Sequence, residues 1–437
     1  MKKLLVFFAA LALVLAYATP AKAACEHITI GASISFLGLY QENNLDYNDD
    51  AEDAVSYYAE YVDIYLENEY TDNVKTYIEM DLYSPFHDHY NKTLTVEQAY
   101  IQMKEFLNPN LTLTVGKMNV KWELRPTWGA GTLDNLYPEG VNGSLVLNGY
   151  PTAICVTYAF NEDITVTFAI AKCLENSFGG SNSDDLDLYL VRYDQNLQDN
   201  GNFFVAVLYY NDLDGNLEYY DAPTGTTHDL LASIWMLNFG IDYFLQDESL
   251  ELYFEGVYQD GDSDANIDFG TVAINCGAEY TFKDSETVPY VGLDVTFFQG
   301  QDDDTVAFQR INTDWTRTLI AENDFFGGLA GWSTGSVLTP GYLGIKLVAG
   351  MKNISNEKFA VDFIVGYFQA DGDLNSTSRD DALGWEVDAI VSYMYTEDVT
   401  FTIGFGYFDP DEELSGAIQV ADPDGVWTAV VGCTIIF

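Results

Sequence analysis

Carboxylates at alternate positions are the residues of this chain whose type and spacing could do chemistry. Glu386 and Asp388 alternate with the apolar residues Trp385, Val387 and Ala389. Successive side chains of a β-strand point to opposite faces, so this pattern predicts a strand with one apolar and one acidic face. Carboxylates that line an aqueous interior in this way attract cations and set the selectivity of a pore.

The same alternation recurs along the chain and defines a set of predicted pore-lining residues. A charged side chain that faces lipid near the bilayer midplane costs about 2–4 kcal/mol, so we expect these side chains to face water inside a barrel. The alternative for each is that it merely solvates an inner wall or pairs with a nearby lysine or arginine. The set is Glu79, Asp81, Asp242, Glu251, Glu255, Glu279, Asp294, Lys346, Asp362, Glu386 and Asp388.

Loops rich in aspartate and glycine are a second kind of candidate site. One of them carries Asp260, Asp262 and Asp264, separated by Gly261 and Ser263. Such oxygen donors suit Ca²⁺, but the chain lacks the twelve-residue spacing with a closing glutamate. We therefore expect solvated loop tips that bind Ca²⁺ loosely beside lipopolysaccharide, with specific calcium sites as the alternative and no other cofactor.

Histidines and nucleophile motifs give no support for an enzyme. His87 and His89 form the only histidine pair among the four histidines, and no third ligand is in view. His27 and His228 have no evident serine or aspartate partner. Serine-hydrolase, P-loop and zinc-protease patterns are absent from the sequence. We expect a protein without catalytic residues.

The charge balance restricts the partners. The chain has 68 acidic and 18 basic residues, a formal net charge of −50. This excess argues against nucleic acid and other anionic polymers as partners. It favours cations and small neutral solutes.

The last segment of the chain alternates over a length that can cross a bilayer as a tilted strand. Its apolar parity carries Trp427, Ala429, Val431, Cys433, Ile435 and Phe437. A terminal strand that ends on an aromatic residue resembles the signal by which Gram-negative outer-membrane barrels are recognised for insertion. We expect the barrel-assembly machinery to bind through Phe437, and outer-membrane lipid and lipopolysaccharide to surround the protein.

Turn-like clusters divide the chain into strands and alternate in length. Eight short clusters alternate with nine longer ones, as in outer-membrane barrels with short periplasmic turns and long extracellular loops. The pattern predicts an all-β, transmembrane antiparallel β-barrel of about 18 strands, with sixteen as the alternative and both termini periplasmic. One longer cluster is expected to extend over residues 212–228.

The N-terminus has the features of a secretory signal peptide. Lys2 and Lys3 precede an apolar stretch, and Ala21 and Ala23 flank Lys22 as a small-x-small cleavage site. We expect residues 1–23 to be removed and residues 24–437 to form a single barrel domain in the outer membrane of a Gram-negative bacterium.

One stretch of about fifty residues resembles a known family. It runs from Glu97, Ala99 and Tyr100 through Gly116-Lys117 and Trp128 to Gly140-Val141. This path is similar to that of alginate-export-like and related porins. The resemblance implies a barrel of similar length and strand number, with alginate or polysaccharide export as a possible activity.

We predict a porin-like channel for passive diffusion of small hydrophilic solutes, with an acidic, cation-preferring lumen. Residues 123–143, with Arg125, Trp128, Asp134 and Glu139, are expected to fold into the lumen as the constriction. Residues 300–340 are the second candidate. The alternatives are an alginate or polysaccharide export barrel and a non-conducting surface barrel with Ca²⁺-binding acidic loops.

Overall fold

The computed structural model describes most of the strands and short turns of the chain. The described residues are 28–42, 55–85, 93–118, 120–121, 148–149, 151–175, 185–221, 226–245, 247–263, 269–300, 308, 318–322, 341–355, 358–371, 382–411 and 424–437. The predicted signal peptide, residues 1–23, lies outside them. In the described part of the chain, no helix is long and apolar enough to cross a membrane.

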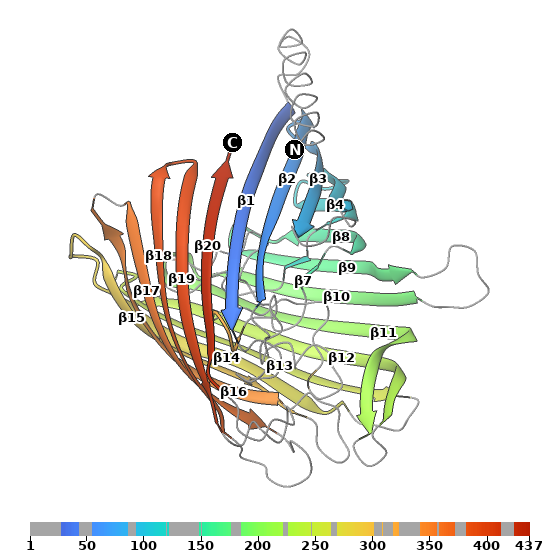
Figure 1. Ribbon diagram of the computed structural model, residues 1–437. Helices are drawn as coiled ribbons and strands as arrows, with labels where there is room; N and C mark the ends of the chain where they lie inside the picture. The colour runs from blue at the N-terminus through green and yellow to red at the C-terminus, as the bar shows by residue number, and fades with distance from the viewer. Residues whose placement is uncertain are drawn as a thin grey trace.

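Eighteen strands form one antiparallel sheet (Figure 1). The first nine are β1 (Ile28–Glu42), β2 (Val55–Thr71), β3 (Val74–Pro85), β4 (Thr93–Met103), β5 (Leu111–Lys117), β8 (Thr152–Ala159), β9 (Ile164–Glu175), β10 (Asp185–Asn196) and β11 (Gly201–Asp221). The other nine are β12 (Thr226–Leu245), β13 (Leu250–Ser263), β14 (Thr271–Thr281), β15 (Pro289–Phe298), β16 (Gly341–Ile354), β17 (Phe359–Asp371), β18 (Ala382–Thr396), β19 (Val399–Pro410) and β20 (Val426–Ile436). A separate pair joins β6 (Val120–Lys121) to β7 (Asn148–Gly149), and a short 3-10 helix, η2 (Gln198–Asn200), precedes β11.

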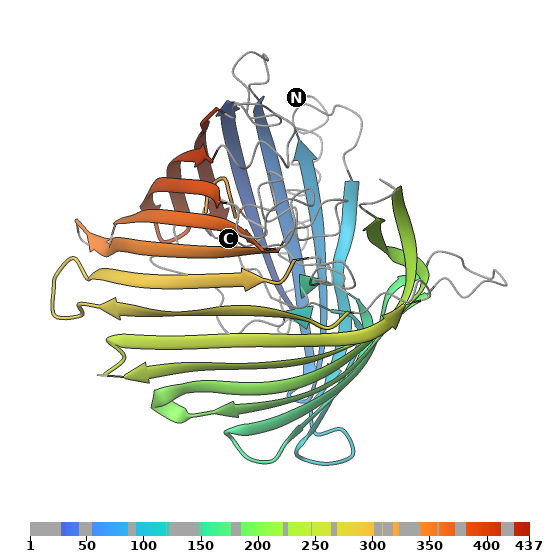
Figure 2. The same cartoon turned by 90° about the horizontal axis from the view of Figure 1, so that it is seen from below.

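The sheet closes on itself because its first and last strands pair. β1 and β20 are antiparallel neighbours, from Ser33 opposite Ile436 to Glu42 opposite Trp427. The backbone N–H of Phe437 donates to the carbonyl of Ala32 at 2.9 Å, so the ladder continues to the last residue. Figure 2 shows the strands curling around a central space. The predicted antiparallel 18-stranded barrel is confirmed.

The predicted alternation of connection lengths holds only in part, because the connections β3–β4, β11–β12 and β13–β14, which were predicted to be long, contain seven, four and seven residues. Eight other connections, at every second position along the chain, contain two to seven residues. The expected loop over residues 212–228 is wrong, because β11 continues to Asp221 and β12 begins at Thr226. The turn-like residues after Asp212 are accommodated in a bulge, beyond which Leu217 pairs with Leu230 and the two strands extend.

Alternating side chains give the barrel two different faces. On β17, Phe363 is 54% exposed and Val365 48% on the outward face, whereas Asp362 is 4% exposed and Phe368 fully buried on the inward face. The same alternation holds on β18, β19 and β20. The buried core therefore lies inside the barrel, while the outward face carries apolar side chains.

Aromatic side chains gather at both ends of the outward face. The loop-side aromatic cluster consists of Trp385, Tyr407 and Trp427, with 4.2 Å between the ring centroids of Tyr407 and Trp427. The turn-side aromatic cluster contains Phe359 and Tyr393, whose centroids are 4.6 Å apart. Because 3.2–3.4 Å separates successive residues of a strand, about 26 Å of strand separates Trp385 from Tyr393.

Candidate functional site: the inner wall of the barrel

All eleven predicted pore-lining residues lie on the inward face of the sheet. Nine are buried, and Glu79 and Glu251 are half-buried. The set divides between two regions, because Glu79 and Asp81 belong to β3 and the others to strands from β12 to β18. The two regions differ in what covers them.

Glu386 is covered by a segment of the connection between β15 and β16. Its side chain is 1% exposed, and residues 318–322 lie over it. The Glu386 carboxylate accepts hydrogen bonds from the backbone N–H of Ile320 at 2.7 Å, the N–H of Ala321 at 2.8 Å and the hydroxyl of Thr318 at 2.8 Å. We call residues 318–322 the tethered segment. Donors aimed at one carboxylate bind it strongly, because hydrogen bonds to a charged group are worth about 1.5–3 kcal/mol each.

Asp388 holds the same segment at a second point. Its carboxylate accepts a hydrogen bond from the backbone N–H of Leu319 at 3.1 Å, and the side chain is fully buried. The sequence predicts that Glu386 and Asp388 line a water-filled lumen. In the structure, these two carboxylates instead meet backbone donors, because the tethered segment lies inside the barrel and displaces water from them.

Glu322 ends the tethered segment and joins it to β16. The hydroxyl of Tyr342 donates to Glu322 Oε1 at 3.0 Å, and Lys346 Nζ forms an ion pair with Glu322. The same ammonium lies 2.6 Å from Asp294 Oδ1 on β15. Lys346 is 2% exposed and both carboxylates are buried. The buried Lys346 ammonium therefore pairs with two buried carboxylates, Asp294 on the barrel wall and Glu322 on the tethered segment.

Neutral donors complete the surroundings of Asp294. Its carboxylate accepts hydrogen bonds from the amide of Asn275 at 2.9 Å and from the hydroxyl of Tyr253. The hydroxyl of Thr296 donates to Asp294 at 3.3 Å and accepts from Lys346 at 3.0 Å. A buried ion pair is tolerated when such bonds satisfy its remaining polar atoms. This network fixes the position of Lys346.

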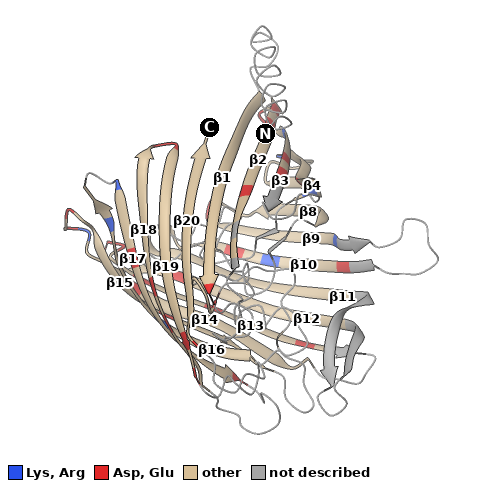
Figure 3. Ribbon diagram, in the orientation of Figure 1, with Lys and Arg blue, Asp and Glu red and all other residues tan. Residues whose placement is uncertain are grey.

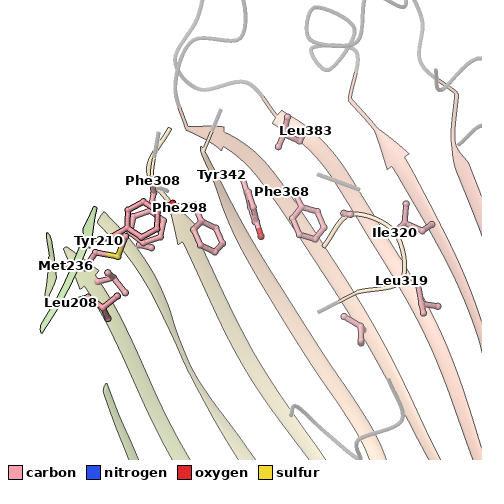
Figure 4. Close-up of a cluster of buried hydrophobic side chains, with 14 of the residues drawn as sticks. Leu208, Tyr210, Met236, Phe298, Phe308, Leu319, Ile320, Tyr342, Phe368 and Leu383 are labelled. Atoms are coloured by element: carbon pink, nitrogen blue, oxygen red, sulfur yellow. The ribbon is translucent and has the colours of Figure 1, made fainter. Parts of the chain in front are cut away.

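An aromatic row supports the connection nearer to the loop end of the wall. Phe298, Tyr342, Phe368 and Phe408 come from β15, β16, β17 and β19, and consecutive centroids lie 5.5, 6.5 and 6.4 Å apart. Phe308, from the same connection as the tethered segment, packs on Phe298 at 5.9 Å. Figure 4 shows Phe298, Phe308, Tyr342 and Phe368, with Leu319 and Ile320 near the wall. The described parts of the predicted second constriction loop thus lie inside the barrel.

The other predicted constriction, residues 123–143, lies outside the described residues, and the calcium loop is described only in part. Arg125, Trp128, Asp134 and Glu139 lie outside the described residues, as does Asp264. Asp260 and Asp262 belong to the loop end of β13, where only the backbone of Asp262 is described. Among the described residues, no group of three or more histidine, cysteine, aspartate or glutamate side chains is arranged to hold a metal ion.

A row of tyrosines on β2, β3 and β4 is a feature of the inner wall that the sequence analysis missed. Tyr65 and Tyr77 stack with their centroids 6.2 Å apart, and Tyr77 and Tyr100 with theirs 5.4 Å apart. All three are half-buried. The sequence assigns no inward face on β2, because both parities there carry charged and aromatic residues, and the alignment of the three rings depends on strand register, which sets Tyr77 opposite Tyr100.

Carboxylates lie beside the tyrosine row. Glu79 accepts a hydrogen bond from the amide of Gln98, and Asp63 accepts one from the hydroxyl of Ser33. Figure 3 shows acidic residues on β2 and β3 in red. Asp63 and Glu79 are half-buried, so this region presents more polar surface to the lumen than the region under the tethered segment.

Comparison with known proteins shows that this chain is similar in fold to several solved structures. No family model matches the chain, and no curated protein matches it in sequence. Among solved structures, OccK9 (OpdG) of Pseudomonas aeruginosa is similar, with a TM-score of 0.59 and 10% identity over 94% of this chain and 99% of that one. OccK8 (OprE) of the same organism has a TM-score of 0.58 and 10% identity, covering 94% and 98%. OccAB1 of Acinetobacter baumannii has a TM-score of 0.53 and 11% identity, covering 93% and 97%.

These likenesses concern the architecture. At about one identical residue in ten, they show the same barrel fold over almost the whole of each chain. They support the porin-type barrel that the sequence predicts, and they give no support to the narrower alginate-export-like resemblance.

Proposed function

We propose that this protein is an outer-membrane porin of a Gram-negative bacterium, through which small hydrophilic solutes diffuse passively. The observation that carries the proposal is the closed 18-stranded sheet with an apolar outward face and a polar inward face. Closure pairs every strand edge, which β-structure needs in lipid. The likeness in fold to the Occ-type barrels supports a transport role and not an enzymatic one.

The outward face fits a bilayer. The loop-side and turn-side aromatic clusters flank apolar residues such as Val387 and Val391, as aromatic girdles flank the apolar band of outer-membrane barrels. We further propose that residues 1–23 direct export and that Phe437 is recognised during assembly. The exposed Phe437 side chain at the end of the closing strand supports the second point.

We propose a preference for cations over anions. Ten of the eleven predicted pore-lining residues are acidic, and the chain carries a formal net charge of −50. Lys346 compensates part of the charge beneath the tethered segment. The half-buried carboxylates Asp63, Glu79 and Glu251 remain toward the lumen, where they raise the local concentration of cations.

The tethered segment is the described element that narrows the lumen in this proposal. It lies on the inward face, where Glu386, Asp388 and Lys346 hold it. Pore diameter and charge near a constriction together set selectivity. The position of the tethered segment, and not only the charge of the wall, should therefore control conductance.

Planar-bilayer recording tests the proposal. Purified protein in a KCl gradient should give discrete channels whose reversal potential reports permeation of K⁺ over Cl⁻. A reversal potential of the opposite sign would leave a porin without the proposed cation preference. Absence of channels, together with absence of liposome swelling in small sugars, would contradict the porin function and favour a non-conducting surface barrel. Adding a chelator halfway through the recording tests whether loosely bound Ca²⁺ affects the current.

A further inference from the structure

We infer that the outward face of β5, β8 and β9 carries, at its loop-side end, a binding site for an outer-leaflet lipid whose headgroup bears two phosphates. The site consists of Lys117, Thr152 and Lys172, together with apolar residues nearer the middle of the same strands. The inference goes beyond the proposed function, because it names a partner for the outer surface of the barrel. It rests on that function only for the orientation in the membrane, with the long connections on the outer-leaflet side.

Strand register places the two lysines in one row. Lys117 is the Cα partner of Thr152, and Thr152 is in turn the Cα partner of Lys172. Lys117 ends β5, Thr152 begins β8 and Lys172 lies near the end of β9, so the row lies at the loop-side end of the sheet. Neighbouring strands are about 4.8 Å apart, so about 10 Å separates the Cα atoms of the two lysines.

The row lies on the outward face, next to exposed apolar residues. Two positions nearer the middle of each strand, Val115, Ile154 and Ile170 are 38%, 53% and 57% exposed. These three residues are also Cα partners of one another across the strands. Residues two positions apart on a strand share a face, so the lysines point outward as well. A lipid whose acyl chains contact this apolar row would have its headgroup at the level of the lysines.

Neighbouring aromatic residues mark the depth of the lysines in the membrane. Tyr189 is the Cα partner of Ile170 and continues the apolar row onto β10, and the ring of Tyr209 lies 6.2 Å from that of Tyr189. The two tyrosines are 43% and 42% exposed. Outward tyrosines of this kind lie at the membrane interface. The lysine row is about 6.6 Å farther along the strands, which is the level of headgroup phosphates.

The side chain of Lys117 extends away from the apolar band. Its ammonium donates a hydrogen bond to the carbonyl oxygen of Val96 at 2.6 Å. Val96 lies three positions on the loop side of Ala99, the Cα partner of Lys117. Long basic side chains extend in this way at a membrane interface and keep their charge in the polar layer. The hydrogen bond is to a neutral group, so it leaves the positive charge of Lys117 for an anion.

Lys172 is held in place by Asp187 on β10. Its ammonium lies 3.3 Å from Asp187 Oδ1, and the Lys172 side chain is 43% exposed, compared with 24% for Asp187. An anion that approaches from the headgroup layer therefore meets the cation of this pair first. The Lys117 and Lys172 ammonium groups contact β4 and β10, on opposite sides of the row. This arrangement suits two phosphates at the two ends of a sugar headgroup, with the exposed Thr152 between them.

Binding of bisphosphorylated lipid A to the folded barrel in detergent micelles, measured by native mass spectrometry with EDTA present, tests the inference. The variant K117Q/K172Q should raise the apparent Kd about 25-fold, because each lysine near an anionic lipid surface contributes a factor of about five. D187N, which removes the neighbouring negative charge, should lower the Kd. The control K104Q/K283Q removes two lysines from the short turns at the opposite end of the barrel and should retain the wild-type Kd.

Two further probes distinguish a lipid with two phosphates from other sources of phosphate. Phosphatidylglycerol, which carries one phosphate, should bind about fivefold more weakly than lipid A, and inorganic phosphate should not displace lipid A. Equal affinity for phosphatidylglycerol, or displacement by inorganic phosphate, would overturn the inferred ligand. Wild-type affinity for lipid A in K117Q/K172Q would overturn the site itself.

The binding assay does not depend on conduction. If no channels form, but lipid A binds and K117Q/K172Q loses this binding, the porin function fails and the lipid site stands. If channels form and K117Q/K172Q binds lipid A like wild type, the lipid site is wrong and the porin function stands. Heat-modifiable gel mobility identifies the folded fraction of each variant, on which the Kd is measured.

Discussion

At the scale of single residues, Lys346 is a buried charge of the inner wall that is held on two sides. It is 2% exposed and lies between Asp294 and Glu322, two buried carboxylates on different elements. Breaking a buried ion pair costs more than replacing it, because the remaining charge stays desolvated. Lys346 therefore stabilises the barrel and the placement of the tethered segment together.

The variant K346M should destabilise the barrel by about 3–5 kcal/mol, since it leaves two buried carboxylates without a cation. Urea unfolding in micelles, followed by tryptophan fluorescence, measures this loss. The triple variant K346M/D294N/E322Q, which removes all three charges, should recover most of the stability. Equal stability of K346M and the wild type would contradict the buried network.

At the scale of elements, the two faces of β18 have different surroundings. Its inward residues Glu386 and Asp388 bind the tethered segment, and its outward residues Val387 and Val391 are about 40% exposed on the apolar face. A shift of the strand by one residue would exchange the two faces. The pairing of β18 with β17 and β19 fixes this choice.

Removing the inward carboxylates should release the tethered segment. In E386A/D388A the three backbone amides and the Thr318 hydroxyl lose their acceptors, and hydrogen bonds to charged groups contribute about 1.5–3 kcal/mol each. Single-channel recording should show a higher and noisier conductance than in wild type. The variant S392A, on the same inward face of β18, serves as a control for truncation of this face. Unchanged conductance in E386A/D388A would show that the segment does not limit the current.

Placing a charge on the outward face of β18 should impair insertion. A lysine at position 387 would face lipid near the middle of the strand and cost about 2–4 kcal/mol. Folding of V387K into lipid vesicles, measured by heat-modifiable gel mobility, should fall relative to the wild type. The variant E397K, in the exposed turn, should fold normally. Full insertion of V387K would argue against a lipid-facing β18.

At the scale of the whole molecule, closure of the barrel depends on the pairing of β1 with β20. Phe36 and Cys433 are Cα partners in that pairing, although 397 positions (433 − 36) separate them in the chain. Closure gives every strand a neighbour on both sides and encloses the inner wall. Without it, the two edges would expose unpaired backbone groups, which is costly in lipid.

The closure can be tested with a native cysteine. Directly opposite residues of an antiparallel pair have Cα atoms about 4.5–5.5 Å apart, within the range for disulfides. The variant F36C should therefore form a disulfide with Cys433 under mild oxidation, seen as a mobility change of the unfolded protein on a non-reducing gel. F36C/C433S should lack this species. Its absence in folded F36C would contradict the pairing of the two strands.

The sequence by itself predicted about 18 strands, most of the short and long connections and the inward face of the eleven pore-lining residues. These properties are local, because side-chain parity has a period of two and turn residues mark each strand end. Glu386, Asp388 and Asp294 could thus be placed on the inward face without knowledge of their neighbours. The extension of β11 and β12 past Asp212 was not predicted. The residues after Asp212 are of types that usually form a turn, but here they lie in a bulge within the strand pair.

Only the tertiary structure decided what each inward residue meets. Glu386 was predicted to face water, but it binds backbone amides of residues 318–322, about 65 positions earlier in the chain. The meeting of Asp63 with Asp81, and of Tyr77 with Tyr100, depends on the register between neighbouring strands. Register and loop insertion result from packing over the whole barrel, where many long-range contacts compete, so a local pattern does not contain them.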